Sequence, residues 1–429
     1  LAGEATVSEA NLQTGDQLTL LTRPVAPLGT KRSWAAIFGD GSVATWGHSD
    51  RAGRPRKGTV QQLKNVQQLQ ATDEAFAAIL DDGSVVAWGE LNYGGDCSAV
   101  QEQLVNVRQI QANRYAFAAI CGDRSVVTWG SNTSGGDSSS VQDQLKDVQA
   151  IQSSSRAFVA ILRDGSAVAW GASSYGGDSS EVQDQLVQVQ SVQACDQAFA
   201  ALRSDGFVVT WGLQSIADSL VLELTAAQKI QANSAAFAAI LQDGSVVTWG
   251  DDSRGGRSVE VQRQLKRVQH VQATVSAFAA ILDGGNVVTW GFGRHGGDSS
   301  AVQEQLIMVR HIQATFRAFA ALREDGSVVT WGSSDGGGTS DQVQEQLNNV
   351  QMLQANSNAF AALRHDGRVV TWGSPLHGGD SGAVQGQLEN VKEIQAAPYS
   401  FAAITAGSIV SWGLDCHCQN HAATVIKST

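Results

Sequence analysis

The sequence predicts an all-β repeat protein in which ten copies of one unit, each about 41 residues long, stack on one another. The first observation is a Trp-Gly pair that recurs along almost the whole chain, at Trp46, Trp88, Trp129, Trp170, Trp211, Trp249, Trp290, Trp331, Trp372 and Trp412. The second is that each copy contains three short apolar or alternating segments, which are typical of strands. A unit of this size cannot bury its apolar side alone, so neighbouring units must pack together.

The third repeat illustrates the expected strands, which are residues 107–112, 116–120 and 125–129. Between the second and third strands most copies carry Asp-Gly, as at Asp82-Gly83, which supplies the positive φ of a tight antiparallel hairpin. The second strand reads Phe-Ala-Ala-Ile or Phe-Ala-Ala-Leu in most copies. Alanine is a poor strand former. We therefore expect neighbouring layers to approach closely, with Phe and Trp filling the gaps between them.

After Trp-Gly, most copies read a version of Gly-Gly-Asp-Ser-Ser-x-Val-Gln-x-Gln-Leu, which predicts a short helix of two turns. Ser180 and Gln183 have the spacing of a capping box, and so do the pairs Ser98 and Gln101, Ser139 and Gln142, and Ser300 and Gln303. Each Gly-Gly-Asp also supplies a carboxylate, namely Asp96, Asp137, Asp178, Asp298 and Asp380. Carboxylates suit a cation such as Ca²⁺, but one per copy favours capping of a helix start.

The repeats divide the chain into residues 1–24, the ten-repeat domain 25–413 and a tail, 414–429. Residues 1–24 resemble the last third of a ubiquitin-like domain, and an extended arm is the alternative. The chain begins at Leu1 rather than Met, so it can be a piece of a longer protein. Repeat 5 lacks Gly-Gly-Asp after Trp211, and the first and last repeats are atypical. In the tail, Cys416, Cys418 and His421, with His417 between the cysteines, offer ligands that suit Zn²⁺.

The formal charge of −12 disfavours binding to nucleic acids or to anionic membranes. We predict no transmembrane segment, because no apolar run approaches the ~18 residues that span a bilayer. Five scattered cysteines favour a reduced, intracellular setting, in the cytoplasm or the nucleus, with an organelle left open. No metalloprotease motif and no phosphate-binding loop motif is present. We therefore predict a protein that is not an enzyme and needs no cofactor.

Comparison of the ten copies separates the repeated strands from the variable loops at their ends. Loops at strand ends are where a rigid scaffold displays binding groups, and Tyr and Arg are enriched at binding hot spots. We hypothesise that one rim binds a partner, and the alternative is drift at solvated turns. The candidate residues are Tyr93, Arg114, Tyr115, Tyr175, Arg254, His295, Phe316, Arg317, His377 and Tyr399.

The copies resemble the repeat of the regulator of chromosome condensation family. The matching features are a Val-x-x-Ile-x-Ala strand, an aromatic-Ala-Ala-Ile/Leu strand, the Asp-Gly turn, and Val-Val-Thr-Trp-Gly with a Gly-rich continuation, over residues 25–413. The resemblance implies a β-propeller, commonly of seven blades. Here the repeat is shorter and there are ten copies, so an open β-superhelix of the same repeats is the alternative to a ring. A bacterial β-lactamase inhibitor protein of the same superfamily is similar in its short, three-stranded blades.

We therefore predict a protein–protein interaction scaffold, or a subunit of a larger assembly, that binds other proteins through the loops of one rim. The alternative, which the resemblance implies, is a guanine-nucleotide exchange factor or a regulator associated with a ubiquitin ligase.

Overall fold

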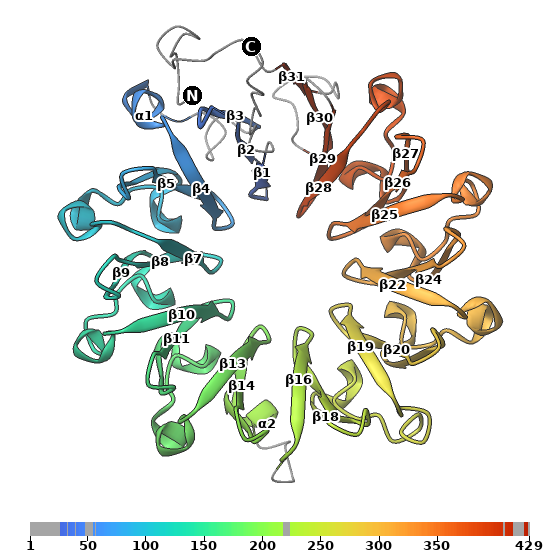
Figure 1. Ribbon diagram of the computed structural model, residues 1–429, viewed down its shortest axis with the longest axis horizontal. Coiled ribbons are helices and arrows are strands. Elements are labelled where there is room, and N and C mark those ends of the chain that lie inside the picture. Colours follow the sequence, from blue (N-terminus) through green and yellow to red (C-terminus); the bar gives the residue numbers. More distant parts are fainter. Residues whose placement is uncertain are drawn as a thin grey trace, which may run out of the picture.

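The chain forms a ring of blades around a central opening, as the computed structural model shows (Figure 1). The structure describes residues 26–31, 33–38, 40–47, 55, 57–217, 224–405, 408–414 and 424–427. Within these residues, ten antiparallel sheets succeed one another in sequence order, one for each repeat. The sequence prediction of an all-β protein built from ten three-stranded repeats is confirmed.

Each blade places its first strand nearest the centre, its second strand in the middle and its third strand outermost (Figure 1). The inner strands are β1 (Ala26–Gly29), β4 (Val66–Ala71), β7 (Gln109–Ala112), β10 (Val148–Ser153), β13 (Val189–Ala194), β16 (Ala227–Ala232), β19 (Val268–Ala273), β22 (Val309–Ala314), β25 (Val350–Ala355) and β28 (Glu393–Ala397). The middle strands are β2 (Ser33–Ile37), β5 (Ala75–Leu80), β8 (Ala116–Ile120), β11 (Ala157–Leu162), β14 (Ala198–Arg203), β17 (Ala236–Leu241), β20 (Ala277–Leu282), β23 (Ala318–Arg323), β26 (Ala359–Arg364) and β29 (Ser400–Ile404). The outer strands are β3 (Val43–Gly47), β6 (Val85–Gly89), β9 (Val126–Gly130), β12 (Ala167–Gly171), β15 (Val208–Gly212), β18 (Val246–Gly250), β21 (Val287–Gly291), β24 (Val328–Gly332), β27 (Val369–Gly373) and β30 (Ser408–Gly413). A further strand, β31 (Thr424–Lys427), pairs with β30.

The expected two-turn helix is a 3-10 helix on the outside of the ring, in the copies where it forms. Its instances are η2 (Ser98–Gln103), η4 (Gln142–Gln144), η6 (Ser180–Gln185), η9 (Ser300–Gln305), η11 (Gln344–Gln346) and η13 (Gly382–Gln387). A second group of short 3-10 turns directly follows Trp-Gly: η1 (Leu91–Tyr93), η3 (Asn132–Ser134), η5 (Ser173–Tyr175), η7 (Asp252–Arg254), η8 (Gly293–His295), η10 (Ser334–Gly336) and η12 (Pro375–His377). The two α-helical segments are α1 (Lys57–Gln62) and α2 (Gln214–Ala217).

The predicted capping boxes are wrong. In the fourth blade, Ser179 rather than Ser180 precedes the helix, and its side chain makes no capping bond. Instead Ser179 Oγ donates to Gln183 Oε1 at 2.8 Å, and Gln183 Nε2 donates to the carbonyl of Ala167 at 2.8 Å. The glutamine therefore ties the outer segment to the start of the third strand. The same Gln-to-strand bond is made by Gln101, Gln142 and Gln303, the other members of the predicted pairs.

The core consists of one cluster for each junction between blades. In the cluster between the second and third blades, Ala75 and Ala77 of β5 pack against Phe117 and Trp129 of the next blade. The alanines and Phe117 have no exposed surface. Within a blade, Phe117 and Trp129 are directly opposite across β8 and β9, and their rings stack with centroids 5.1 Å apart. The small alanine side chains thus let neighbouring blades approach closely, as the sequence predicts.

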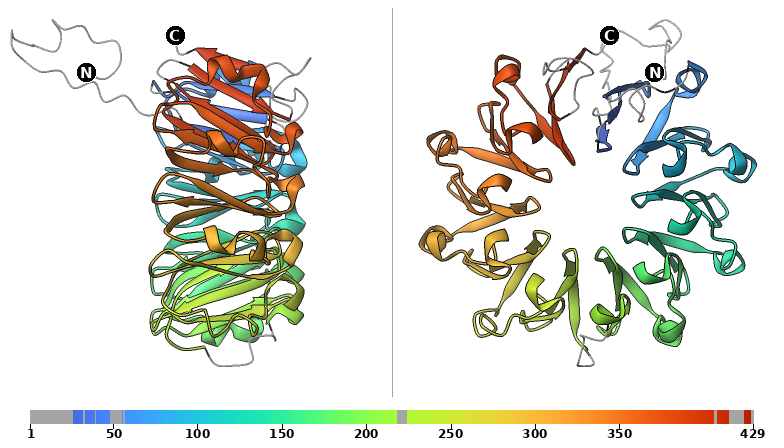
Figure 2. Two further views of the ribbon diagram at one scale, coloured as in Figure 1. Left: turned by 90° about the vertical axis from the view of Figure 1, so that its right-hand side faces the viewer. Right: turned by 180° about the vertical axis from the view of Figure 1, so that it is seen from behind.

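Two sets of backbone bonds join adjacent blades. On one face of the ring, each Asp-Gly turn accepts a bond from the next blade, as when the amide of Val107 donates to the carbonyl of Gly83 at 2.8 Å. On the other face, one residue at most hairpin tips bonds to its counterpart in the next blade, as when the amide of Asp73 donates to the carbonyl of Arg114 at 3.1 Å. The edge-on view shows the strands crossing the thickness of the ring, so strand ends lie on its two faces (Figure 2).

The ring closes between the first and tenth blades. Trp34 and Trp46 pack in one buried cluster with Ala397, Ala402 and Ile409. Trp34 Nε1 donates to Ser400 Oγ at 2.8 Å, and Trp46 Nε1 donates to Ser411 Oγ at 3.1 Å. These contacts decide between the two predicted arrangements in favour of a closed β-propeller over an open superhelix.

Candidate functional site

The candidate partner-binding residues all lie on one face of the ring. This face, called the hairpin face below, consists of the hairpin between the first and second strands of each blade and the segment that follows Trp-Gly. In the third blade these are Asn113–Tyr115 and Ser131–Ser134, and they are bonded to each other. The opposite face, called the turn face, carries the Asp-Gly turns. The alternation of antiparallel strands therefore brings all ten sequence-predicted residues to the same face, although they come from eight repeats.

A buried polar side chain holds the two segments of the hairpin face together. Asn113 Nδ2 donates to the carbonyl of Ser134 at 2.7 Å, and its Oδ1 accepts from the amides of Tyr115 and Ala116. Other blades make the same bond with Thr72, Ser154, Asn233, Thr274, Thr315 or Asn356. The variable side chains thus project from loops with fixed backbones, and such preorganisation reduces the entropic cost of binding.

A row of aromatic and cationic side chains crosses the second, third and fourth blades. The rings of Tyr93 and Tyr115 lie 5.1 Å apart. The guanidinium carbon of Arg156 lies over Tyr115 at 4.9 Å from its centroid and over Tyr175 at 5.4 Å. Burial raises the pKa of the Tyr93 phenol, with a smaller contribution from the charge of Glu74. The sequence-based set omits Arg156, because only the ring geometry shows that it lies between two tyrosines from different repeats.

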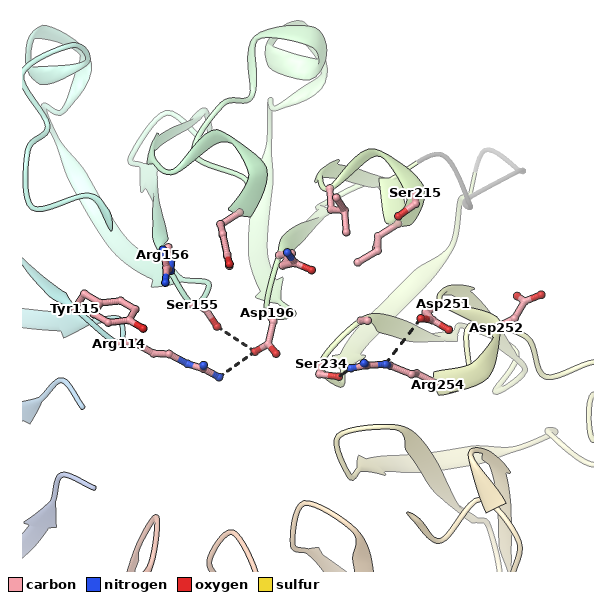
Figure 3. Close-up of a pocket in the computed structure, with 15 residues that line it drawn as sticks. Arg114, Tyr115, Ser155, Arg156, Asp196, Ser215, Ser234, Asp251, Asp252 and Arg254 are labelled. Carbon is pink, nitrogen blue, oxygen red and sulfur yellow. Dashed lines mark hydrogen bonds and ion pairs between the residues drawn. The ribbon is translucent and has the colours of Figure 1, made fainter. Parts of the chain in front are cut away.

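The end of this row opens into a cavity of about 520 Å³ (Figure 3). Arg114, Tyr115 and Arg156 line one side, and Asp251, Asp252 and Arg254 line the other. The cavity forms where repeat 5 lacks the Gly-Gly segment and continues after Trp211-Gly212 into α2 instead. The departure of repeat 5 from the pattern therefore has a structural consequence on the hairpin face.

Most charged groups of the cavity are paired with each other. Arg114 Nη2 lies 3.5 Å from Asp196 Oδ1, which also accepts from Ser155 Oγ at 3.1 Å. Arg254 donates to Ser234 Oγ, and its Nε lies 3.9 Å from Asp251 Oδ2. Figure 3 draws both groups, with Asp196 between Arg114 and Ser155.

The remaining candidate residues form two smaller clusters with a more apolar character. His295 contacts Phe292 edge-on at 4.7 Å, and burial together with the charges of Arg317 and Arg254 lowers its pKa. His377 and Tyr399 lie 5.1 Å apart, and burial lowers the pKa of His377. Exposed apolar side chains also lie on this part of the face, namely Phe292, Phe316 and Leu376.

The mouth of the central opening is ringed by one residue of each hairpin. These residues are Lys31, Asp73, Arg114, Ser155, Asp196, Ser234, Val275, Phe316, Ser357 and Pro398, and backbone bonds join most neighbouring pairs. Pro398 has no amide hydrogen, so it cannot donate to Lys31 across the closure. The mouth is charged from Lys31 to Asp196 and largely apolar from Val275 to Pro398, which gives the hairpin face two chemically different halves.

The structure assigns the Gly-Gly-Asp carboxylates to local turns. Asp178 Oδ1 accepts from the amide of Ser180 at 3.0 Å, which is the first residue of η6, and this bond lowers the pKa of Asp178. The equivalent bond is made by Asp96, Asp137, Asp298 and Asp380. This geometry favours the predicted capping role over a cation site.

Among the described residues, no group of three His, Cys, Asp or Glu side chains is placed to hold a metal ion. The zinc hypothesis concerns Cys416, Cys418 and His421, which lie outside the described residues, as does the segment 1–24. No described helix combines the length and the hydropathy that crossing a membrane requires.

No model of a known protein family matches the chain, and no curated protein matches it in sequence. Similar solved structures include the computationally designed protein Ika8, which is 17% identical, with 76% of this chain and 97% of that chain covered and a TM-score of 0.35. Prp20p from Saccharomyces cerevisiae, described with its binding properties to Gsp1p and histones, is 15% identical over 77% of this chain and 79% of that chain, with a TM-score of 0.36. The CRINKLY WD40 ectodomain of an Arabidopsis thaliana receptor kinase is 15% identical over 60% of this chain and 93% of that chain, with a TM-score of 0.32. At these identities and TM-scores, the similarities carry no argument about what this chain binds.

Proposed function

We propose that the protein is an interaction scaffold or a subunit of a larger assembly, and that its hairpin face binds another protein. The observation that carries the proposal is the row formed by Tyr93, Tyr115, Arg156 and Tyr175 beside the cavity. Tyrosine and arginine dominate binding hot spots, because they bury a large area and also offer polar groups.

The two faces of the ring support this choice of surface. On the turn face, the side chains of the turns bond to their own loops. Asp82 Oδ1, for example, accepts from both the amide and the hydroxyl of Ser84. On the hairpin face, two aromatic rings are exposed, Phe292 at 43% and Phe316 at 47%, whereas the exposed apolar side chains of the turn face are aliphatic, as at Val187 and Ile307. Apolar groups and aromatic residues on loops with fixed backbones are typical of a surface that a partner covers.

The proposal is tested by affinity capture from native cells with three forms of the protein. These are the wild type, a triple variant of the hairpin face (Tyr93→Ala, Tyr115→Ala, Tyr175→Ala), and a matched triple variant of the turn face (Arg163→Ala, Val187→Ala, Ile307→Ala). We expect the wild type and the turn-face variant to retain the same partner and the hairpin-face variant to lose it. Equal capture by all three forms, or loss only in the turn-face variant, would contradict the proposal.

The identity of the captured chain also separates the two sequence-based functions. A small GTPase whose nucleotide exchange is accelerated, or a component of a ubiquitin ligase, would support the regulatory alternative. A stoichiometric partner without either property would support a scaffold or subunit.

A further inference from the structure

The cavity on the hairpin face contains a cation, Arg156, that pairs with no carboxylate of the described residues. Among the described residues, no carboxylate oxygen lies within ion-pair distance of the guanidinium of Arg156, whereas Arg114 and Arg254 have acidic neighbours. Arg156 instead lies over the rings of Tyr115 and Tyr175. Among the described lining residues, the positive charge without a carboxylate partner is therefore that of Arg156.

The surroundings of Arg156 also leave its hydrogen-bond donors unused. A guanidinium is planar and has its N–H groups along its edge. Among the described residues, no acceptor takes a hydrogen bond from the side-chain N–H groups of Arg156, so they remain available to a ligand. A carboxylate matches this edge, since its two oxygens can accept a pair of parallel hydrogen bonds. Lysine offers no such matched pair of donors.

The acidic residues of the cavity do not prevent a ligand carboxylate from reaching Arg156. Asp196 is the carboxylate drawn nearest the middle of the cavity wall, and it is already bonded to Arg114 and Ser155 (Figure 3). Asp251 accepts from the amide and hydroxyl of Ser253, and it lies with Asp252 on the opposite side from Arg156. A ligand carboxylate can therefore meet Arg156 without facing an unneutralised Asp196.

We propose that this cavity binds a carboxylate group of the partner protein, held by paired hydrogen bonds from Arg156. The carboxylate belongs either to an Asp or Glu side chain or to a chain terminus. A volume of about 520 Å³ lies within the range of ligand pockets and accommodates one or two residues of a partner. This inference rests on the proposed function, because it names the group that the hairpin face recognises.

The test uses three small probes on the full chain with ¹⁵N-labelled arginine. Acetyl-glutamate methylamide carries a side-chain carboxylate, N-acetylglycine carries a terminal one, and acetyl-glutamine methylamide is the neutral match. The Arg156 Nε–H resonance is identified by its absence in Arg156→Lys. We expect it to shift and saturate with one or both carboxylates and not with the glutamine compound. A response to the glutamate compound alone indicates a side chain, and a response to N-acetylglycine alone indicates a terminus.

Two variants separate recognition by Arg156 from general charge attraction. Arg156 and Arg163 lie at opposite ends of β11, so Arg163→Gln removes the same charge from the turn face of the same blade. Because the Arg156 variants lack that resonance, binding of the probes to all variants is measured by calorimetric titration. We expect Arg156→Gln and Arg156→Lys to weaken carboxylate binding about ten-fold or more, and Arg163→Gln to leave it unchanged. Equal shifts with the glutamine compound, no shift with either carboxylate, or equal weakening by Arg163→Gln would overturn the proposal.

Failure of this inference is distinguishable from failure of the proposed function. If Arg156→Gln captures the same partner as the wild type with unchanged affinity, the hairpin face still binds a protein but not through this carboxylate site. If the hairpin-face triple variant captures what the wild type captures, the proposed function fails, whatever the probes show at Arg156.

Discussion

Trp34 donates a hydrogen bond from Nε1 to Oγ of Ser400, 2.8 Å away, although the two residues are 366 positions apart in the sequence. At most other junctions, the tryptophan of the Trp-Gly pair in one blade donates to the carbonyl of the first Gly of the Gly-Gly pair in the preceding blade, as Trp129 does to Gly94. The tenth repeat has no Gly-Gly pair. Ser411 Oγ replaces the missing carbonyl as the acceptor for Trp46, and Ser400 Oγ accepts from Trp34, which stands where the other blades have Phe. Both bonds join the tenth blade to the first.

The first prediction concerns this closure. Ser400→Ala leaves the buried Nε1–H of Trp34 without its acceptor, and we expect a loss of about 1–3 kcal/mol in the free energy of unfolding. Combining it with Trp34→Phe recreates the Phe and Ala found in the other blades, so the double loss should be smaller than the sum of the single losses. Denaturant unfolding of the three variants measures this coupling. Additive losses, or no loss from Ser400→Ala, would argue against a bonded closure.

The second prediction concerns Trp249, whose buried Nε1 has no hydrogen-bond partner among the described residues. The preceding blade is the fifth, which lacks Gly-Gly, so the usual acceptor is absent. Trp290 faces an intact pair and donates to the carbonyl of Gly255 at 3.1 Å. We expect Trp290→Phe to destabilise the protein by about 1 kcal/mol more than Trp249→Phe, because only the former breaks a hydrogen bond. Equal losses in unfolding experiments would contradict this difference.

The third prediction explains why the Gly-Gly pair recurs. Gly94 has φ of +88°, and a Cβ there would lie 2.6 Å from Phe117 Cδ2 in the next blade. Gly94→Ala should therefore cost more than the ~1 kcal/mol of an unfavourable φ alone, because the fully buried Phe117 cannot move away. Gly284 is the matched control, since it has φ of +98° and a Cβ there meets nothing within 4 Å. A melting temperature that falls equally in both variants would show that the blade contact is not responsible.

The fourth prediction concerns how the stability of the fold falls in acid, to which several Asp side chains of the turn face contribute. Hydrogen bonds from Ser84 and Ser245 lower the pKa values of Asp82 and Asp243 below 3.8, and equivalent bonds act on Asp164 and Asp325. A lowered pKa means that the folded state prefers the charged form. The contribution to stability is complete above 3.8 and is lost as the pH falls through the folded-state values. Replacing these four residues with Asn should flatten the loss of stability below pH 4, as followed by denaturant unfolding across pH, and an unchanged acid profile would refute the assignment.

Much of the fold could be predicted from the sequence, because ten copies of one unit show which positions keep the same kind of residue and which positions vary. The Phe-Ala-Ala and Trp-Gly segments indicate strands that pack closely, and Phe117, Trp129 and the alanines of β5 do so. The capping boxes failed for a local reason. Gln183 bonds to a strand carbonyl rather than to the helix start, and spacing alone cannot reveal that choice.

The candidate site could be predicted only as a set of exposed positions. The variable loops indicated positions that share one face of the ring, but which side chains lie together depends on the contacts between neighbouring blades. Tyr115, Arg156 and Tyr175 come from two repeats, and nothing in their spacing shows that their side chains stack. The cavity likewise depends on the neighbours that repeat 5 acquires in the ring. Closure itself rests on Trp34 and Ser400, whose departures from the repeat become interpretable once the two ends meet.

The most direct test of partner binding by the hairpin face is hydrogen–deuterium exchange on the complex with the captured partner. We predict that protection on binding is confined to hairpin-face segments, with the largest effect at residues 91–94, 113–115, 154–156 and 173–175. The Asp-Gly turns at 81–84, 163–166 and 324–327 should exchange as they do in the free protein. Protection of those turns, with the hairpin face unchanged, would contradict the account.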